Sequence, residues 1–256
     1  MALSRDRPEP LLVVHGLGDR ALAWRRFAAA MEPGREVVTF DLPGHGDAPP
    51  GADYRYPALV EAVGRAAEGY DRFALLGHSI GGAVAWVYAA RHPERVTRLV
   101  LVEAAAPHRS RFIDCPSPAA THPYTYSSLA EAVEALSAFD PTATEEVVRE
   151  NYRERPDGRW EPAFDAAIFP MLVDDQRENG RRYWEDLGGI RVPTLVVRAG
   201  ASFGDAGQLE EIAAAIPGAR LLTLDGVGHF LHRERPDQLA QAVGEFLAEP
   251  PRAVAG

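Results

Sequence analysis

The sequence contains no lysine and a single cysteine, and each shortage removes a class of chemistry. All 27 basic residues are arginines, so a lysine Schiff base and a lysine general base are excluded. Cys115 has no second cysteine to pair with. This excludes an intramolecular disulfide and any zinc or iron–sulfur site built on several thiolates. The nucleophile and the base of an enzymatic reaction must therefore come from other residue types.

Long apolar runs and an excess of positive charge are also missing. No stretch is long and apolar enough to cross a bilayer. Residues 1–10 are polar rather than a basic segment followed by an apolar one, so we expect a cytoplasmic protein without a secretory signal. The formal net charge of −10 disfavours binding to nucleic acids or to acidic membranes. We therefore expect a small-molecule partner, whereas the sequence does not define the oligomeric state.

Short apolar runs alternate with amphipathic stretches along most of the 256 residues. The runs are rich in Val and Leu, as buried parallel strands are, and they span residues 11–14, 37–40, 73–76, 99–102, 194–197 and 220–224. Helical periodicity covers residues 22–31, 59–69, 81–91, 209–216 and 238–247. The alternation predicts a single α/β domain, in which a mostly parallel sheet of about six strands is covered by helices on both faces.

The interval from Ala104 to Gly189 breaks this alternation. It lacks a convincing buried strand and carries helical patterns at residues 129–139 and 145–153. It holds 16 acidic and nine basic residues, which accounts for −7 of the net charge. Its aromatic side chains amount to more apolar mass than disordered linkers usually contain. We therefore predict a helical cap of residues 104–189, inserted into a core of residues 1–103 and 190–256, and we expect the cap to set substrate specificity.

A short glycine-rich motif, Gly-His-Ser-Ile-Gly-Gly at residues 77–82, stands where a predicted strand gives way to a predicted helix. A serine at such a turn is held in a strained conformation that projects its hydroxyl above the sheet edge. The flanking Gly77 and Gly81 leave room for neighbouring backbone. This context predicts that Ser79 is a nucleophile. His78, inside the same turn, is expected to shape the substrate pocket.

A serine hydroxyl needs a nearby base whose pKa lies near neutrality, and His229 is the candidate among the eight histidines. It follows the last predicted strand and precedes the final helix, which brings it over the carboxyl edge of the sheet. The other histidines have simpler explanations: His15 and His45, for example, lie in Gly-rich turns. We therefore predict that His229 is the general base.

Acyl transfer also needs hydrogen-bond donors for a developing oxyanion. The turn after the first predicted strand reads His-Gly-Leu-Gly at residues 15–18. In this geometry the backbone N–H groups of Leu17 and Ile80 would converge on one point beside the nucleophile. Gly16, Leu17 and Ile80 are therefore predicted substrate-binding positions, and the two N–H donors would act through the backbone rather than through a side chain.

Taken in order along the chain, these motifs resemble the α/β-hydrolase superfamily over nearly the whole sequence. The resemblance implies that family's fold and its order of nucleophile, acid and histidine, with Ser79 and His229 matching directly. The acid has two candidates. Asp205 lies in the loop after the predicted strand at 194–197, slightly later than is usual in the family, and Glu103 follows the preceding strand. The sequence favours Asp205, although either carboxylate would orient the imidazole and stabilise its charged form.

Two reaction classes fit this set of residues. One is hydrolysis of an ester, thioester or lactone through an acyl-Ser79 intermediate, and the alternative is a lyase or cyclase that uses the same site without hydrolysis. The intact Ser79 and His229 disfavour a ligand receptor without turnover, and a serine at position 79 disfavours reactions that need a carboxylate nucleophile. No cofactor is expected. No metal site is expected either, since His229 and His232 lack a clustered set of further ligands in the sequence.

Overall fold

The computed structural model describes residues 8–32, 34–109, 125–138, 140–202 and 206–250. Its main body is built on a six-stranded sheet with the order β2-β1-β3-β4-β7-β8, in which every pair of neighbours is parallel. The strands are β1 (Leu11–Val14), β2 (Val37–Phe40), β3 (Phe73–His78), β4 (Val96–Val102), β7 (Thr194–Ala199) and β8 (Arg220–Leu224). The predicted α/β fold with a six-stranded parallel sheet is confirmed.

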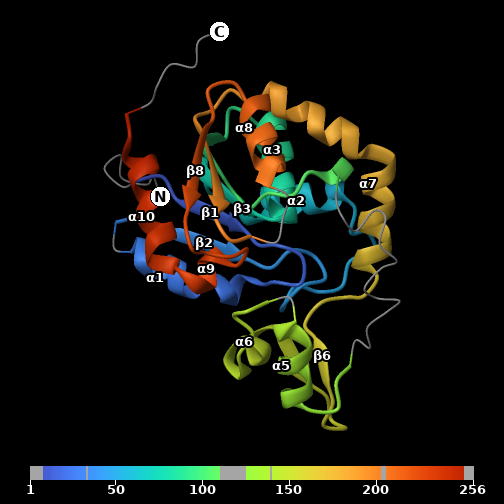
Figure 1. Cartoon of the computed structure of the whole chain (residues 1–256). Helices are drawn as coiled ribbons and strands as arrows, with labels where there is room; N and C mark the ends of the chain where they lie inside the picture. The colour runs from blue at the N-terminus through green and yellow to red at the C-terminus, as the bar shows by residue number, and fades with distance from the viewer. Residues whose placement is uncertain (1–7, 33, 110–124, 139, 203–205, 251–256) are drawn as a thin grey trace.

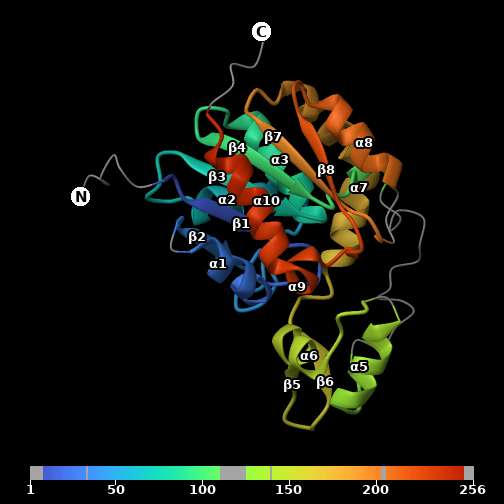
Figure 2. The same ribbon diagram turned by 60° about the vertical axis from the view of Figure 1, so that its left-hand side comes forward.

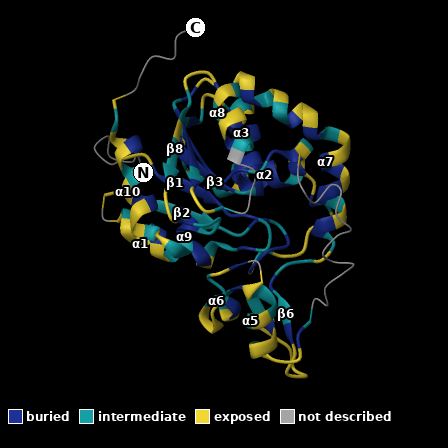
Figure 3. Ribbon diagram, viewed as in Figure 1, coloured by how far each residue is buried: buried dark blue, intermediate teal, exposed yellow. Residues whose placement is uncertain are grey.

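Both faces of the sheet are covered by helices, which explains why the strands read as continuous apolar runs. In β1, Leu12 and Val14 belong to one apolar cluster and Leu11 and Val13 to the other, because successive side chains of a strand point to opposite faces. The first cluster is covered by α2 (Tyr56–Ala66), α3 (Ile80–Arg91) and α8 (Ala206–Ala215), and the second by α1 (Arg25–Met31) and α10 (Pro236–Ala248) (Figure 1). Figure 3 shows the central strands buried between helices whose outer sides are exposed, whereas the edge strands β2 and β8 are mostly half-buried.

The register of the sheet brings the carboxyl ends of its central strands together. Val14 of β1 is paired with Gly77 of β3. Val102 of β4 is paired with His78 of β3 on one side and with Val197 of β7 on the other. The loops that follow these strands therefore begin at the same edge, which is where open parallel sheets bind their ligands.

The interval between β4 and β7 contains more than the two helices that the sequence suggested. These are α5 (Leu129–Ser137) and α6 (Glu145–Asn151), and their N-caps Ser128 and Thr144 accept hydrogen bonds through side-chain oxygens. The interval also holds an antiparallel hairpin of β5 (Tyr152–Glu154) and β6 (Trp160–Pro162), and the long helix α7 (Ile168–Glu185). Strands of three residues are too short to give a periodic signal, so the hairpin is an addition to the predicted helical cap.

The described residues of 125–162 form what we call the small lobe. It comprises α5, α6, β5 and β6, and it lies to one side of the main body in both views (Figures 1 and 2). Its apolar cluster consists of Tyr126, Ala132, Val148 and Trp160. Helix α7 instead packs on the main body, because its buried residues share the cluster of α2 and α3. The division into a core and a cap of residues 104–189 stays a prediction. Within the described ranges, no helix combines the length and apolar character that a bilayer span requires.

Candidate active site

Ser79 lies at the turn between β3 and α3 in a strained backbone conformation, with φ 53° and ψ −121°. An added Cβ at Gly77 would lie 2.2 Å from the carbonyl oxygen of Gly81, and one at Gly81 would lie 2.3 Å from the carbonyl oxygen of His15. Because backbone occupies the space on both sides, only glycine fits at these two positions. The close packing produces a sharp turn that leaves Ser79 partly exposed while its two neighbours are buried.

Glu103, directly after β4, shares this unusual backbone geometry. Among the described residues, it and Ser79 are the two non-glycine residues with a positive φ, and its value is 49°. Its side chain is 3% exposed, and Oε2 lies 3.1 Å from Nδ1 of His229. The backbone N–H of Ala199 donates to Oε1 at 2.7 Å, and the hydroxyl of Ser202 donates to Oε2. These donors fix the carboxylate so that it faces the imidazole.

His229 lies in the loop between β8 and α9 (Leu231–Glu234) with its side chain 14% exposed. A carboxylate only accepts hydrogen bonds, so the contact with Glu103 places the imidazole proton on Nδ1 and leaves Nε2 as the basic nitrogen. The carbonyl oxygen of His229 accepts a hydrogen bond of 3.0 Å from Nε2 of His78. Since His78 precedes Ser79, this bond ties the serine turn to the histidine loop. The other predicted acid, Asp205, lies outside the described residues.

The turn after β1 presents the amide of Leu17 without an internal partner. The N–H of Gly18 donates to Nε2 of His45 at 3.3 Å, and the N–H of Asp19 donates to the carbonyl of Gly16 at 3.2 Å. The N–H of Leu17 has no acceptor within the described part of the chain. An added Cβ at Gly16 would lie 3.1 Å from Cβ of the serine. The turn therefore approaches Ser79 directly, with one donor still available.

Ile80 supplies the second predicted donor. It is the first residue of α3, so its N–H has no acceptor within the helix. The N-terminus of the helix also carries partial positive charge. The two amides are suited to bind an oxyanion, and their convergence on a single point stays a prediction.

His15 and His45, which both lie in Gly-rich turns, hold the turn after β1 in place. The N–H of Leu42 donates to Nε2 of His15 at 2.9 Å, so Nδ1–H of His15 donates to the carbonyl of Gly16 at 2.8 Å. Burial lowers the pKa of His15, and it lowers the pKa of His45 to about 3. Both rings are therefore neutral at pH 7. The signal that could have revealed them is a histidine shortly after each of two strands, β1 and β2, that are neighbours in the sheet.

His78 is 1% exposed and lies among other rings behind His229. Its ring centroid is 4.8 Å from that of His229 and 4.9 Å from that of His232, which stacks on Trp24 at 4.3 Å. Burial lowers the pKa of His78 well below its usual range. The contact that the structure gives His78 is with the His229 loop, and its predicted role in the substrate pocket stays a prediction.

Asp19, His78 and His232 are also a group whose ligand atoms lie within 4.8 Å of one another. The carboxylate of Asp19 is already 3.0 Å from Nε2 of His232 and 2.7 Å from Nη2 of Arg233. A guanidinium beside the carboxylate disfavours a metal ion at the same place, because two cations repel each other. We therefore assign the group to a polar network rather than to a metal centre, and the expected lack of a metal or cofactor stays a prediction.

Comparisons with known proteins identify the family of this chain. The chain is 22% identical over 266 residues to the esterase YbfF of Escherichia coli (strain K12), with 96% of each chain covered. It is 28% identical over 272 residues to the sn-1-specific diacylglycerol lipase ABHD11 of Mus musculus, covering 96% of this chain and 83% of that protein. A solved esterase of M. tuberculosis superposes with a TM-score of 0.78 at 23% identity, covering 95% of this chain and 86% of that one. A family model described as alpha/beta hydrolase fold matches residues 9–236, and the chain therefore belongs to the alpha/beta hydrolase fold family.

Proposed function

We propose that this protein is a serine-dependent hydrolase that cleaves an ester, thioester or lactone through an acyl-Ser79 intermediate. The observation that carries the proposal is the contact of 3.1 Å between buried Glu103 and Nδ1 of His229, on the loops beside the strained Ser79. The relatives named as an esterase and a diacylglycerol lipase, each matched over 96% of this chain, support ester hydrolysis as the reaction.

The first half of the reaction follows from the positions of the protons. As Oγ of Ser79 attacks the carbonyl carbon, Nε2 of His229 takes the hydroxyl proton, and Glu103 stabilises the imidazolium that forms. The N–H groups of Leu17 and Ile80 donate to the oxyanion of the tetrahedral intermediate. When the intermediate collapses, the bond to the alcohol or thiol breaks, the leaving group takes the proton from His229, and the acyl group remains on Oγ.

The second half reverses these roles with water as the nucleophile. Water attacks the acyl carbon and gives a proton to Nε2 of His229, which again forms an oxyanion at the same two donors. The second collapse breaks the bond to Oγ of Ser79, returns the proton to that oxygen and releases a carboxylic acid. The sequence offers no lysine that could serve as an alternative base.

Within this proposal Glu103 is the acid. It follows β4, the strand directly beside β3, and the N–H of Ala199 and the hydroxyl of Ser202 hold its two oxygens so that Oε2 faces the imidazole. The family resemblance favours Asp205, which follows β7, one strand further from the serine turn. Substitution of each carboxylate separately decides between them.

We assign the choice of substrate to residues 104–189, because the catalytic groups above come from loops of the sheet and are common to hydrolysis of any ester. Exchange of this segment for that of a relative, with Asp140 retained, is expected to change the preferred p-nitrophenyl ester while Ser79 remains reactive. Loss of Ser79 reactivity in the exchanged protein would contradict this assignment. A small-molecule substrate and a cytoplasmic location remain part of the proposal.

The proposal is tested by intact mass measurement of the wild type and of Ser79→Ala after exposure to a fluorophosphonate, together with turnover of p-nitrophenyl esters. We expect one added phosphonyl group on the wild type, none on Ser79→Ala, and ester turnover that depends on Ser79. A folded wild-type protein that is not labelled and does not cleave esters would refute the hydrolase proposal. It would favour the lyase or cyclase chemistry that the same residues allow.

A further inference from the structure

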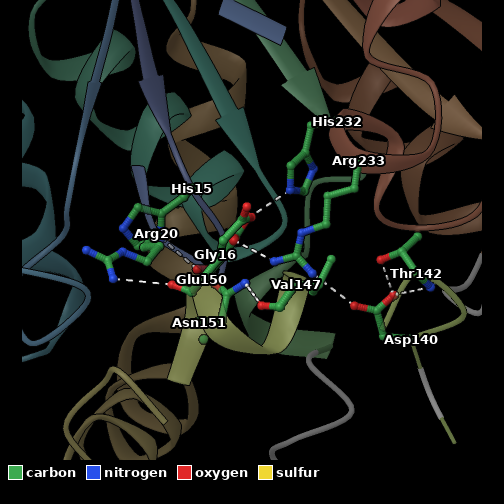
Figure 4. A network of polar contacts seen from close by, with 12 residues as sticks. His15, Gly16, Arg20, Asp140, Thr142, Val147, Glu150, Asn151, His232 and Arg233 are labelled. Carbon is green, nitrogen blue, oxygen red and sulfur yellow. Dashed lines mark hydrogen bonds and ion pairs between the residues drawn. The ribbon is translucent and has the colours of Figure 1, made fainter. Parts of the chain in front are cut away.

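Arg233 occupies a buried position at the junction of the main body and the small lobe. Its Nη2 lies 2.7 Å from Oδ1 of Asp19 in the main body, and its Nη1 lies 2.9 Å from Oδ2 of Asp140 in the small lobe. The side chains are 10%, 3% and 5% exposed, respectively. Figure 4 shows Arg233 beside His232 on α9, with a dashed contact from its guanidinium to Asp140 of the small lobe. One guanidinium therefore binds both parts of the molecule away from solvent.

On the side of the main body, the contacts of Arg233 extend to two loops of the candidate site, which are the turn after β1 that contains Leu17 and the loop that contains His229. Asp19 lies two residues after Leu17, the predicted oxyanion donor, and its second oxygen is 3.0 Å from Nε2 of His232. His232 and Arg233 belong to α9, which begins two residues after His229. A displacement of Arg233 therefore acts on the oxyanion turn through Asp19 and on the catalytic histidine through α9.

The charge of Asp19 is retained in spite of its burial. Burial raises the pKa of this carboxyl, but Arg233 and then His232 outweigh that effect and hold the pKa well below its usual range. Arg233 therefore lies between an ionised carboxylate and Asp140. A buried charge is costly when it loses its partner, so the guanidinium keeps its position only while its carboxylate partners keep theirs.

On the side of the small lobe, Asp140 is fixed before it meets Arg233. Its Oδ1 accepts hydrogen bonds from the backbone N–H of Thr142 at 2.8 Å and from the hydroxyl of Thr142 at 2.5 Å. These bonds form a turn between α5 and α6. A movement of the small lobe would therefore displace the carboxylate of Asp140 that Arg233 binds.

A second set of ion pairs joins the same two parts of the molecule but is exposed. Glu146 of α6 lies 2.6 Å from Arg25 and 3.0 Å from Arg26, with the three side chains 39% to 56% exposed. The two arginines begin α1, which packs against α9 and α10, but their guanidinium groups bind Glu146 through exposed side chains. Exposed pairs of this kind contribute little. Glu146 is therefore a matched control, because it joins the lobe to the main body through exposed arginines of α1 rather than through the buried Arg233.

We propose that Arg233 is a positioning residue that couples the docking of the small lobe, through Asp140 and Asp19, to the alignment of His229 and of the oxyanion turn. The catalytic meaning of this coupling rests on the proposed hydrolase function. Docking of the lobe then sets the reactivity of Ser79 itself and not only the affinity for substrates that reach the lobe.

The test uses the full chain and compares Asp140→Ala with Glu146→Ala. The rate of Ser79 phosphonylation by a small fluorophosphonate and the kcat for p-nitrophenyl acetate should fall about 10- to 100-fold in Asp140→Ala. Both should stay within about twofold of the wild type in Glu146→Ala. Acetate is the shortest acyl group of the ester series, so a role of Asp140 in binding longer substrates alone would raise KM for the longer esters and leave both of these rates unchanged. That result would overturn the proposal, as would equal losses in the two variants.

A double-mutant cycle adds a second criterion. If Asp140 acts through Arg233, adding Asp140→Ala to Arg233→Met should cause no further loss, whereas independent effects would multiply. Should Asp140→Ala fail to fold, Asp140→Asn removes the charge while keeping the shape of the side chain. Independent effects in the cycle would refute the coupling.

A readout without catalysis separates failure of the coupling from failure of the hydrolase proposal. Backbone amide exchange in residues 15–20 and 227–235 should accelerate in Asp140→Ala and not in Glu146→Ala, because the two loops lose their common support. If the wild type is not labelled by the fluorophosphonate, the hydrolase proposal fails and the exchange data still decide the coupling. Unchanged exchange in both loops would refute it.

Discussion

Glu103→Gln is the substitution that most directly tests the proposed catalytic acid. In the wild type, Oε1 accepts the N–H of Ala199 at 2.7 Å, and Oε2 faces Nδ1 of His229 at 3.1 Å and the hydroxyl of Ser202. Glutamine has nearly the same shape but only one oxygen. Its amide must therefore present an NH2 group either to His229 or to Ala199.

Each orientation of the amide is harmful for a different reason. With the oxygen toward Ala199, the NH2 group faces Nδ1 of His229, so the imidazole proton moves to Nε2 and the base is lost. With the oxygen toward His229, the NH2 group faces the N–H of Ala199, which leaves a buried donor unpaired at a cost of about 1–3 kcal/mol. In both orientations the imidazolium loses the negative charge that stabilises it.

We expect kcat to fall by about 10³- to 10⁴-fold, because a triad acid that is changed to its amide leaves the histidine in the wrong tautomer. This range corresponds to about 4–5.5 kcal/mol of transition-state stabilisation. The assay is the kcat for p-nitrophenyl acetate and the rate of fluorophosphonate labelling, with circular dichroism to verify the fold. Asp205→Asn, measured in the same way, is the control and should leave both rates near the wild type.

The opposite pattern would refute the reasoning. If Glu103→Gln keeps most of the activity while Asp205→Asn loses it, Asp205 is the acid and the contact between Glu103 and His229 is structural. Comparable large losses in both variants would show that both carboxylates contribute. A Glu103→Gln protein that is inactive because it is unfolded is recognised by its circular dichroism, and Glu103→Asp then serves as the milder test.

Three further predictions follow from burial, backbone packing and the assigned site. Burial lowers the pKa of His15, His45, His78 and His232, so their stabilising effect is complete above about pH 6.5 and is lost as the pH falls. Urea titrations between pH 7.5 and 5.5 should show the free energy of unfolding fall with the pH, by up to about 1.4 kcal/mol per pH unit for each histidine that stays neutral in the fold. A flat profile would contradict their burial as neutral rings. Gly81→Ala should lower the free energy of unfolding by about 1–3 kcal/mol, because the added Cβ would lie 2.3 Å from a backbone oxygen. Gly244→Ala is the control and should raise it by about 0.5–1 kcal/mol, because nothing lies within 4 Å of the added Cβ. Equal shifts of the two melting temperatures would be inconsistent with this packing. Dialysis against EDTA should leave ester turnover unchanged, whereas a loss that zinc restores would point to a metal in the reaction.

The sequence by itself determined the fold and the position of the glycine-rich turn at Ser79. Apolar runs of four or five residues are typical of strands buried in a sheet that helices cover, and the six strands lie where these runs are. The glycines around Ser79 are equally local in their cause, because backbone within 2.3 Å of their missing side chains admits no other residue. Features of this kind can be predicted from the sequence, because each depends on neighbours in the chain or on a repeating pattern.

Only the tertiary structure decided which residues contact one another in the candidate site. Whether Glu103 or another carboxylate meets His229 depends on the strand order β3-β4-β7 and on hydrogen bonds across 96 to 126 positions of the chain. The link from Asp140 to Asp19 through Arg233 joins three segments that no spacing rule connects. Contacts of this kind arise from the packing of distant elements, and burial then gives them their effect by removing the water that would otherwise compete for the same charges.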